Sequence, residues 1–165
     1  MTTKQKLQTL KTPKIGQYWQ GQGGVYAGMM RDGNHQWHLI LAVAPESKIK
    51  APWGEYGQLI EGEFSRVDGR HNMQLIFTAE PENKIVDCFA KLKIEDHNDF
   101  YFPAEYENNL ICMNLPEHVE KTWHWSSTQG SANDAWRQVF EDGDQYVTSK
   151  YGTLAARAVR RLAIQ

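Results

Sequence analysis

Serine and histidine residues lie close enough in this sequence to suggest a nucleophile and its general base. His118 and His124 are near Ser126 and Ser127, and an adjacent imidazole can activate a serine hydroxyl. A catalytic serine is normally exposed on a recognisable sharp turn, and a third residue orients its base. The sequence shows neither feature. We therefore predict no catalytic residues and a protein that is not an enzyme.

Two other patterns suggest ligand binding at first inspection. Residues 21–24 contain three glycines, but their spacing differs from that of a phosphate loop and no lysine follows. The glycines are better explained as positions where the backbone passes beneath Tyr18 and Trp19. His35 and His38 would share one face of a helix, whereas the apolar residues around them favour a strand, on which they point to opposite faces. We predict no transition-metal site and no cofactor.

Carboxylates are concentrated in residues 95–99 and in the turn at residues 141–144. Oxygen-rich clusters of this kind can bind calcium, although neither matches the twelve-residue EF-hand loop. Solvated acids on loops are the commoner explanation, and the sequence leaves calcium binding open.

Composition restricts the class of protein. The chain has 165 residues, a net charge of -2 and 12% aromatic residues, which suits one domain with a core built largely from rings. The charge provides no general attraction for nucleic acid or an anionic membrane. Cys88 and Cys112 lack CxxC spacing and are expected to be reduced thiols, with a single disulfide as the alternative. No signal-peptide or membrane-spanning pattern is present, so we expect a cytoplasmic protein, or one on a particle assembled there.

The first two thirds of the chain predict a hairpin, a long loop and three helices. We expect residues 1–14 to be a flexible arm and residues 15–165 a single domain. Apolar runs at 25–30 and 35–43 flank an Asp-Gly turn, which indicates a hairpin. A long loop is predicted over 45–64. Helices are predicted from a cap at Asn72, from Pro81 and from Pro103, the second with an apolar stripe of Ile85, Cys88, Phe89 and Leu92.

The last third predicts a small antiparallel sheet. Aromatic and β-branched runs at 123–127, 135–140 and 145–148 are separated by turn residues. Alternation in the middle run places Trp136 and Phe140 on an apolar face and Arg137 on the opposite face. We therefore expect Trp125, Trp136 and Phe140 to share one core with the stripe of the second helix. Residues 153–162 have the composition of a helix.

Several short motifs occur in an order that resembles a known family. They are Asp68-Gly-Arg-His-Asn-Met, Cys88-Phe-Ala-Lys-Leu, Asn98-Asp-Phe-Tyr-Phe-Pro-Ala-Glu-Tyr-Glu, Trp125-Ser-Ser-Thr, Ala135-Trp136 to Phe140, Asp142-Gly and Arg157-Ala-Val-Arg. From Gly23 to Arg160 the chain resembles the Lcl C-terminal-domain family, a domain of unknown function frequent in bacterial and prophage proteins. One departure is Asp99-Phe-Tyr-Phe-Pro where the family usually has Asp-Trp-x-Leu-Pro, a size-preserving change.

The resemblance implies a fold and a class of function. It implies an α+β, C-type-lectin-like fold with small twisted antiparallel sheets and two or three helices. It also places residues 157–160 in a closing strand, against their helical composition. Formylglycine-generating enzymes share the fold but act through cysteines, and neither cysteine here corresponds to theirs. The fold is built to carry loops, so we expect a phage- or prophage-type module that binds a protein, or a glycan.

Candidate partner-binding residues are polar or aromatic residues of the C-terminal loops and of the sheet face opposite the core. They are Gln129, Ser131, Asn133, Arg137, Asp144, Tyr146 and Tyr151. The alternative is an intracellular phage accessory factor that inhibits or modulates a host or defence protein. That factor could also act on nucleic acid through Arg157, Arg160 and Arg161, but the acidic net charge argues against this.

Overall fold

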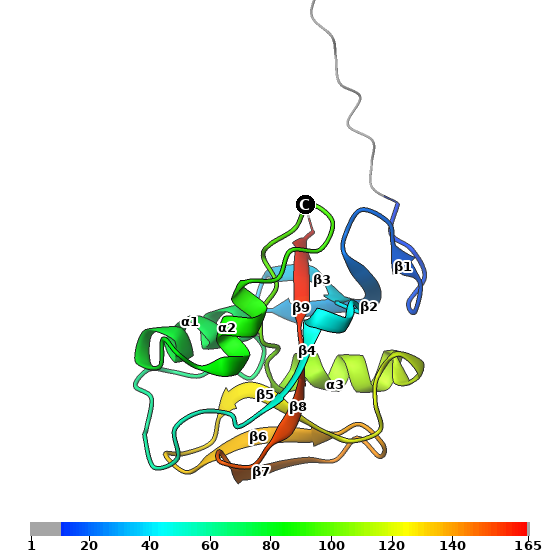
Figure 1. Ribbon diagram of the computed structural model, residues 1–165. Helices are drawn as coiled ribbons and strands as arrows, with labels where there is room; N and C mark the ends of the chain where they lie inside the picture. The colour runs from blue at the N-terminus through cyan, green and yellow to red at the C-terminus, as the bar shows by residue number, and fades with distance from the viewer. Residues whose placement is uncertain (1–10, 165) are drawn as a thin grey trace, which may run out of the picture.

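The computed structural model describes residues 11–164, which form three α-helices and two mainly antiparallel sheets. This is the mixed α+β architecture expected from the sequence. One sheet lies at the top of Figure 1 and the other at the bottom, with helices α1 and α2 to the left and α3 to the right. Residues 1–10 of the predicted flexible arm lie outside the described residues, and residues 11–14 have no regular secondary structure. Among the described residues, no helix has the length and apolar character that a membrane span requires.

The first sheet has the strand order β1-β2-β3-β9. Its strands are β1 (Tyr18–Trp19), β2 (Gly24–Asp32), β3 (His35–Leu41) and β9 (Val159–Ala163). The predicted β2–β3 hairpin is confirmed, and Gly33 has the positive φ of 58° that its tight turn requires. His35 is exposed, whereas the His38 ring packs edge-on against the rings of Trp19 and Tyr26. The two histidines therefore do not form a pair.

The second sheet has the strand order β4-β8-β5-β6-β7. Its strands are β4 (Lys48–Ala51), β5 (Trp123–Gln129), β6 (Asp134–Val139), β7 (Gln145–Ser149) and β8 (Leu154–Arg157). The three strands predicted in the C-terminal third are confirmed. The long loop predicted over 45–64 is wrong in its first part, where a 3-10 helix (Pro45–Ser47) precedes β4. Figure 1 shows β7 at the outer edge of this sheet.

The C-terminal segment joins the two sheets. Strand β8 pairs with β4 in the second sheet, and β9 pairs with β3 in the first. Residues 157–160, which the family resemblance places in one closing strand, are divided between β8 and β9, with Ala158 in neither. The helical composition of residues 153–162 is misleading. Small alanines at 155, 156 and 158 are buried there, so pairing with two sheets outweighs the modest helical preference of the isolated segment.

The helices begin at residues that differ from those predicted. They are α1 (Gly69–Ala79), α2 (Lys84–Ala90) and α3 (Glu105–Asn114). The predicted cap at Asn72 is wrong, because the Asp68 carboxylate accepts the His71 backbone N–H and starts α1 earlier. Asn72 is instead buried, where it donates to the carbonyl of Ser65 and to the hydroxyl of Ser127. Helix α2 starts after Pro81, with Asn83 as its cap.

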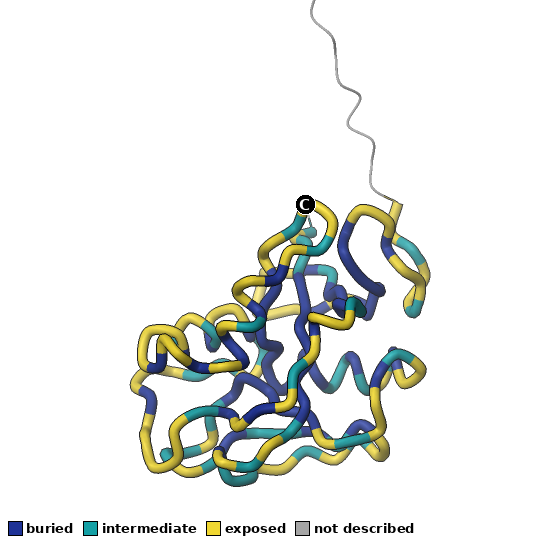
Figure 2. The backbone as a smooth tube through the Cα atoms, viewed as in Figure 1, coloured by how far each residue is buried: buried dark blue, intermediate teal, exposed yellow. Residues whose placement is uncertain are grey.

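Of the three aromatic residues expected to share one core with the stripe of α2, only Trp125 does so. Trp125 packs in one buried cluster with Ile85, Phe89 and Leu92, while Phe140 belongs to a second cluster. Figure 2 shows buried backbone through the centre of the molecule and exposed backbone mainly on the surrounding loops.

The expectation that Trp136 lies in this core is wrong. Its side chain is half-buried, and its ring lies 5.5 Å from the guanidinium of Arg66. The small side chain of Ala135 faces the core in its place, and Gln138 is buried through hydrogen bonds to Asn109 and to the carbonyl of Gly143. Ala135 and Gln138 lie on opposite faces of β6 and both are buried, so the prediction of one apolar core face and one open face on this strand is wrong.

Candidate functional site

The Ser/His pair considered in the sequence is used for internal structure. His124 is buried, its Nδ1 lies 3.1 Å from the carbonyl oxygen of Thr122, and its ring stacks on that of Phe140 at 4.1 Å. The hydroxyl of Ser126 donates to the carbonyl of Trp136. Burial lowers the pKa of His124 to about 4, so its ring is neutral at neutral pH.

The glycine-rich segment and one acidic cluster bind each other. The Glu95 carboxylate accepts the backbone N–H of Gly23 at 2.9 Å and the hydroxyl of Tyr18 at 3.0 Å. The N–H that a phosphate could have used is therefore occupied by an internal carboxylate. Within residues 11–164, no group of three or more His, Cys, Asp or Glu side chains could hold a metal ion. Cys88 and Cys112 are free thiols in α2 and α3.

The three C-terminal arginines serve the interior rather than a nucleic-acid surface. Arg157 donates to the carbonyls of His118 and Ala42, and Arg160 donates to Asp99 at 2.6 Å. Both arginines are buried. Arg161 is bound by Asp68, as described below. These three arginines are therefore not available to contact nucleic acid, as the alternative function would require.

Two of the predicted partner-binding side chains stabilise local structure. Gln129 accepts hydrogen bonds from the backbone of Ile60 and from Lys150 Nζ, and it donates back to the carbonyl of Ile60. The hydroxyl of Ser131 accepts the backbone N–H groups of Asn133 and Asp134, which closes the β5–β6 turn. These contacts explain why both side chains are polar without any external partner.

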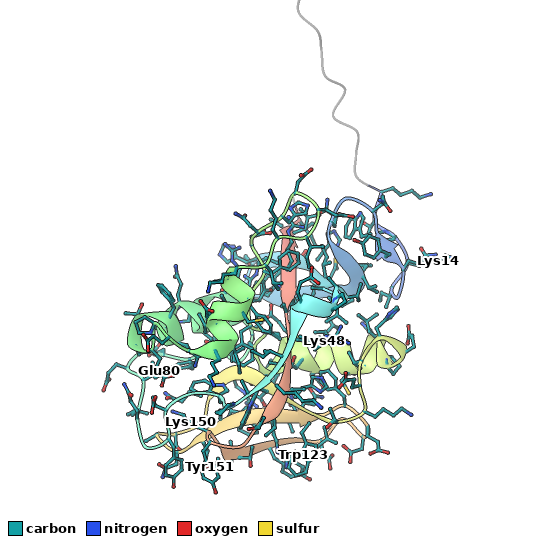
Figure 3. All side chains as sticks on the ribbon, viewed as in Figure 1. Lys14, Lys48, Glu80, Trp123, Lys150 and Tyr151 are labelled. Atoms are coloured by element: carbon teal, nitrogen blue, oxygen red, sulfur yellow. The ribbon has the colours of Figure 1, made fainter. Side chains whose placement is uncertain are left out.

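Asn133 and Tyr151 are exposed, but Tyr151 belongs to a separate hollow. Its side chain is 68% exposed, and its ring packs edge-on against Tyr56 at 5.3 Å. The two rings line a hollow of about 770 Å³, together with Glu80 and the start of α2. Figure 3 shows Tyr151 and Trp123 on the lower side of the second sheet.

Arg137, Asp144 and Tyr146 are brought together with a residue that the sequence did not single out. The Arg137 guanidinium lies 3.7 Å from the centre of the Trp123 ring and 5.3 Å from that of Tyr146. The Tyr146 hydroxyl donates to Asp144 at 3.0 Å. Trp123 and Tyr146 are 48% and 50% exposed. We call these four residues the Arg137 surface. Trp123 pairs with Val139 and Trp125 with Arg137 across the β5–β6 ladder, so Trp123 lies diagonally beside Arg137.

The Arg137 guanidinium is partly withdrawn from water and incompletely bonded. Burial lowers its pKa, although arginine remains charged at any ordinary pH. Among residues 11–164, its Nε and Nη1 have no hydrogen-bond partner and are shielded from solvent. Stacking on Trp123 stabilises the cation and fixes the plane of its fork. The side chain is therefore held in one orientation, with two N–H groups that the described residues leave unsatisfied and out of contact with solvent.

Strand β7 lies beside this surface and has one open edge. The register of the β6–β7 ladder, in which Trp136 pairs with Val147, shows which residue pairs are hydrogen-bonded. Val139 N donates to Asp144 O at one end of the ladder, and Lys150 N donates to Asn133 O at the other. In an antiparallel ladder the bonded and non-bonded pairs alternate, so the backbone groups of Gln145 and Val147 point away from β6. No described strand pairs with that edge.

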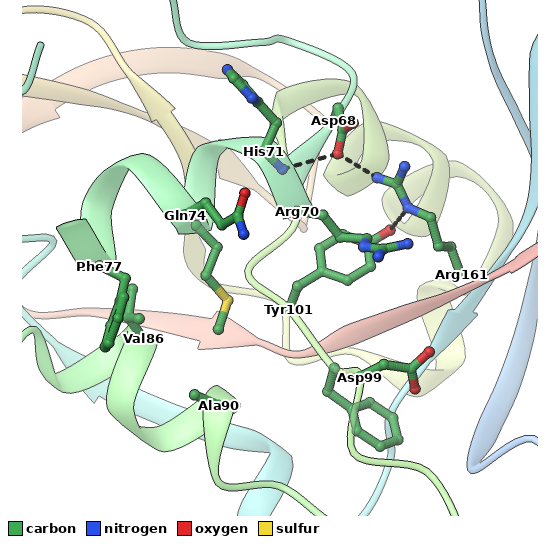
Figure 4. Close-up of a pocket in the computed structure, with 12 residues that line it drawn as sticks. Asp68, Arg70, His71, Gln74, Phe77, Val86, Ala90, Asp99, Tyr101 and Arg161 are labelled. Carbon is green, nitrogen blue, oxygen red and sulfur yellow. Dashed lines mark hydrogen bonds and ion pairs between the residues drawn. The ribbon is translucent and has the colours of Figure 1, made fainter. Parts of the chain in front are cut away.

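A second candidate site is a cleft of about 580 Å³ in front of α1 and α2. In Figure 4, Phe77, Val86 and Ala90 lie toward one end of the cleft, and Asp68, Tyr101 and Arg161 toward the other. Asp68 accepts a hydrogen bond from Arg161 at 2.6 Å, and Arg161 also donates to the Tyr101 hydroxyl at 3.2 Å.

A buried carboxylate lies behind the polar end of the cleft. Glu107 is fully buried, and one of its oxygens accepts the Tyr101 hydroxyl at 2.6 Å while the other accepts the backbone N–H groups of Gly69 and Ala104. Burial raises the pKa of Glu107 to about 7, against the opposing effect of nearby Arg161. The Glu107 carboxylate therefore links the first residues of α1 and α3 to Tyr101 through hydrogen bonds.

Comparison with known proteins adds no relative to this description: a scan against protein-family models finds no match, and a search of curated proteins finds no similar sequence.

Proposed function

We propose that this chain is a non-enzymatic binding module that takes up an extended segment of a partner protein along the open edge of β7. The observation that carries the proposal is the position of the Arg137 surface next to an unpaired, uncharged edge strand. An added strand would gain main-chain hydrogen bonds from the edge and side-chain contacts from the surface. Strand addition of this kind is a recurring mode of peptide recognition.

The sequence of β7 suits this role. The strand reads Gln-Tyr-Val-Thr-Ser and contains no charged residue and no proline. Edges that must stay unpaired usually carry lysine, proline or a bulge, because a bare edge invites pairing. Tyr146 and Val147 are 50% and 46% exposed, so both faces of the edge present apolar area to an added strand.

Arg137 supplies the specificity in this proposal. Its guanidinium is half-buried beside Trp123, and a carboxylate of the partner would form an ion pair with the part of the cation that remains open to solvent. The flanking rings of Trp123 and Tyr146 are the residue types enriched at binding hot spots, and they lose little entropy on binding. The partner segment is therefore extended and carries an acidic side chain near its β-branched or aromatic residues.

The family resemblance fits the same proposal. A prophage-type member of the Lcl C-terminal-domain family with a C-type-lectin-like fold would act on a host or phage protein, in the cytoplasm or on the virion. The loops and open sheet face of the C-terminal half are its recognition region. Glycan binding is the weaker alternative, since the edge offers main-chain pairing that a peptide uses and a sugar does not.

Selection of displayed random linear peptides on the immobilised protein tests the proposal without a known partner. Enriched peptides are expected to alternate apolar and polar residues and to contain an acid. Arg137→Ala should weaken their binding at least tenfold. A tenfold change in Kd corresponds to ~1.4 kcal/mol, and the loss of a charge-assisted hydrogen bond costs more than this. Val147→Pro should also weaken it about tenfold, because the outward N–H is removed while the β6 ladder is kept.

Matched variants separate recognition from folding. Arg31→Ala removes an exposed arginine from the other sheet, so it should bind within about twofold of the parent. Val147→Ala loses side-chain contact but keeps the outward N–H, so it should bind more tightly than Val147→Pro. Selection of no peptide, or equal binding by the Val147→Pro and Val147→Ala variants, would show that β7 is not the recognition edge.

A further inference from the structure

The cleft in Figure 4 has two chemically distinct ends. Its apolar end is formed by Met73 and Phe77 of α1 and by Val86 and Ala90 of α2. Phe77 is 54% exposed although it is a large ring on a helix that packs against the core. With about 580 Å³, the cleft falls within the range of volumes that hold small organic ligands. The apolar end could therefore cover a ring or a short acyl chain.

The charges at the polar end are mostly neutralised within the protein. Asp68 is paired with Arg161, and Asp99 is paired with Arg160, each at 2.6 Å. Arg161 is also held between the rings of Trp37 and Tyr101, 4.2 Å and 5.0 Å from their centres. These groups are fixed in place and contribute little net charge to a ligand.

Arg70 and His71 remain available at the rim of the cleft. Both come from the first turn of α1, line the cleft and are exposed. Nε2 of His71 is 2.8 Å from the carbonyl oxygen of Glu63, which makes this nitrogen the donor. Within residues 11–164, Arg70 forms no salt bridge, so its positive charge is available at the rim. A ligand with an anionic group beside Arg70 and an apolar body against Phe77 would match the chemistry of both ends of the cleft.

We infer that this cleft binds a small organic anion with an apolar aromatic or acyl body, as a site separate from the protein-binding edge at β7. The carboxylate, sulfonate or phosphate of the ligand lies beside Arg70, and the apolar body lies between α1 and α2. The inference does not depend on the proposed function, because none of the residues that line the cleft belongs to β7 or to the Arg137 surface.

Fluorescence titration with 8-anilino-1-naphthalenesulfonate tests the inference, because this probe combines an aromatic body with one sulfonate. The folded protein is expected to bind one probe molecule per chain in a saturable way. Arg70→Gln should weaken binding about fivefold, the effect of an exposed ion pair of ~1 kcal/mol. Phe77→Ala should weaken it by a similar factor, because the probe loses its apolar wall.

Control variants and a neutral probe complete the experiment. Arg31→Gln and Leu59→Ala change an exposed arginine and an exposed apolar residue outside the cleft, and Arg137→Ala changes the other proposed site. All three should bind the probe as the parent does. N-phenyl-1-naphthylamine lacks the sulfonate, so its affinity should be unchanged by Arg70→Gln. Absence of saturable binding, or equal losses in the control variants, would overturn the inference, and so would an Arg70→Gln variant that binds the sulfonate probe like the parent.

Discussion

Glu107→Ala is expected to lower the free energy of unfolding by about 3–5 kcal/mol, the usual cost of removing one partner from a buried charged network. The carboxylate accepts the Tyr101 hydroxyl and the N–H groups of Gly69 and Ala104, and it lies 3.5 Å from Arg161. Alanine leaves these buried donors without an acceptor, and an unsatisfied buried group costs more than a hydrogen bond contributes. Urea unfolding at neutral pH measures the change.

Two comparisons isolate the cause of this loss. Glu107→Gln keeps one acceptor oxygen of nearly the same shape, so it should recover part of the lost stability. Glu117→Ala removes an exposed glutamate near the end of α3 and should change stability by less than about 0.5 kcal/mol. If Glu107→Ala unfolds at the same urea concentration as Glu117→Ala, the network does not fasten the two helices.

Acid is expected to destabilise the protein through His124. Burial lowers the pKa of this ring to about 4, below its ordinary value of 6.5. Below pH 6.5 the unfolded chain takes up a proton that the folded protein does not take up until about pH 4. The stability that His124 contributes is therefore complete above pH 6.5 and is lost as the pH falls toward 4. The full loss corresponds to about 3 kcal/mol.

The difference between the parent and His124→Phe isolates this effect. Phenylalanine keeps a ring stacked on Phe140 but does not titrate. Glu107 acts with the opposite sign, because its folded-state pKa of about 7 lies above its ordinary 4.5, so its contribution is lost as the pH rises through 7. Glu107 is present in both proteins and cancels in the difference. The stability advantage of the parent should shrink by about 3 kcal/mol between pH 7 and pH 4, and a difference that stays constant would contradict a buried neutral His124.

Local patterns in the sequence predicted the elements better than their packing. The Asp32-Gly33 turn defined the β2–β3 hairpin because few residues tolerate the positive φ that it needs. The stripe of Ile85, Phe89 and Leu92 identified the buried face of α2 because helical spacing is regular. Strand β4 was missed because it has only four residues, so its Lys-Ile-Lys-Ala alternation is too short to stand out from the predicted loop.

The candidate site was predicted less completely, for reasons that involve contacts distant in sequence. Trp136 was assigned to the core because alternation placed it with Phe140 on an apolar face, yet Ala135 faces the core and Gln138 is buried by hydrogen bonding to α3. Gln129 was assigned to the surface because it is polar, yet it binds residues 60 and 150. Trp123 was missed because its contact with Arg137 depends on the β5–β6 register, which the sequence does not give. The cleft was not predictable, since residues far apart in the sequence line it; Asp68 and Arg161, for example, are 93 residues apart.

The central claim is that a partner segment adds as a strand to β7, and amide hydrogen exchange of individual residues tests it most directly. In the free protein, the outward N–H groups of Gln145 and Val147 should exchange rapidly, while those of Tyr146 and Thr148 are protected by the β6 ladder. Addition of a selected peptide should slow exchange at Gln145 and Val147 by at least about tenfold, because each N–H gains a main-chain acceptor. Saturation with peptide that leaves these two amides exchanging as in the free protein would contradict the account.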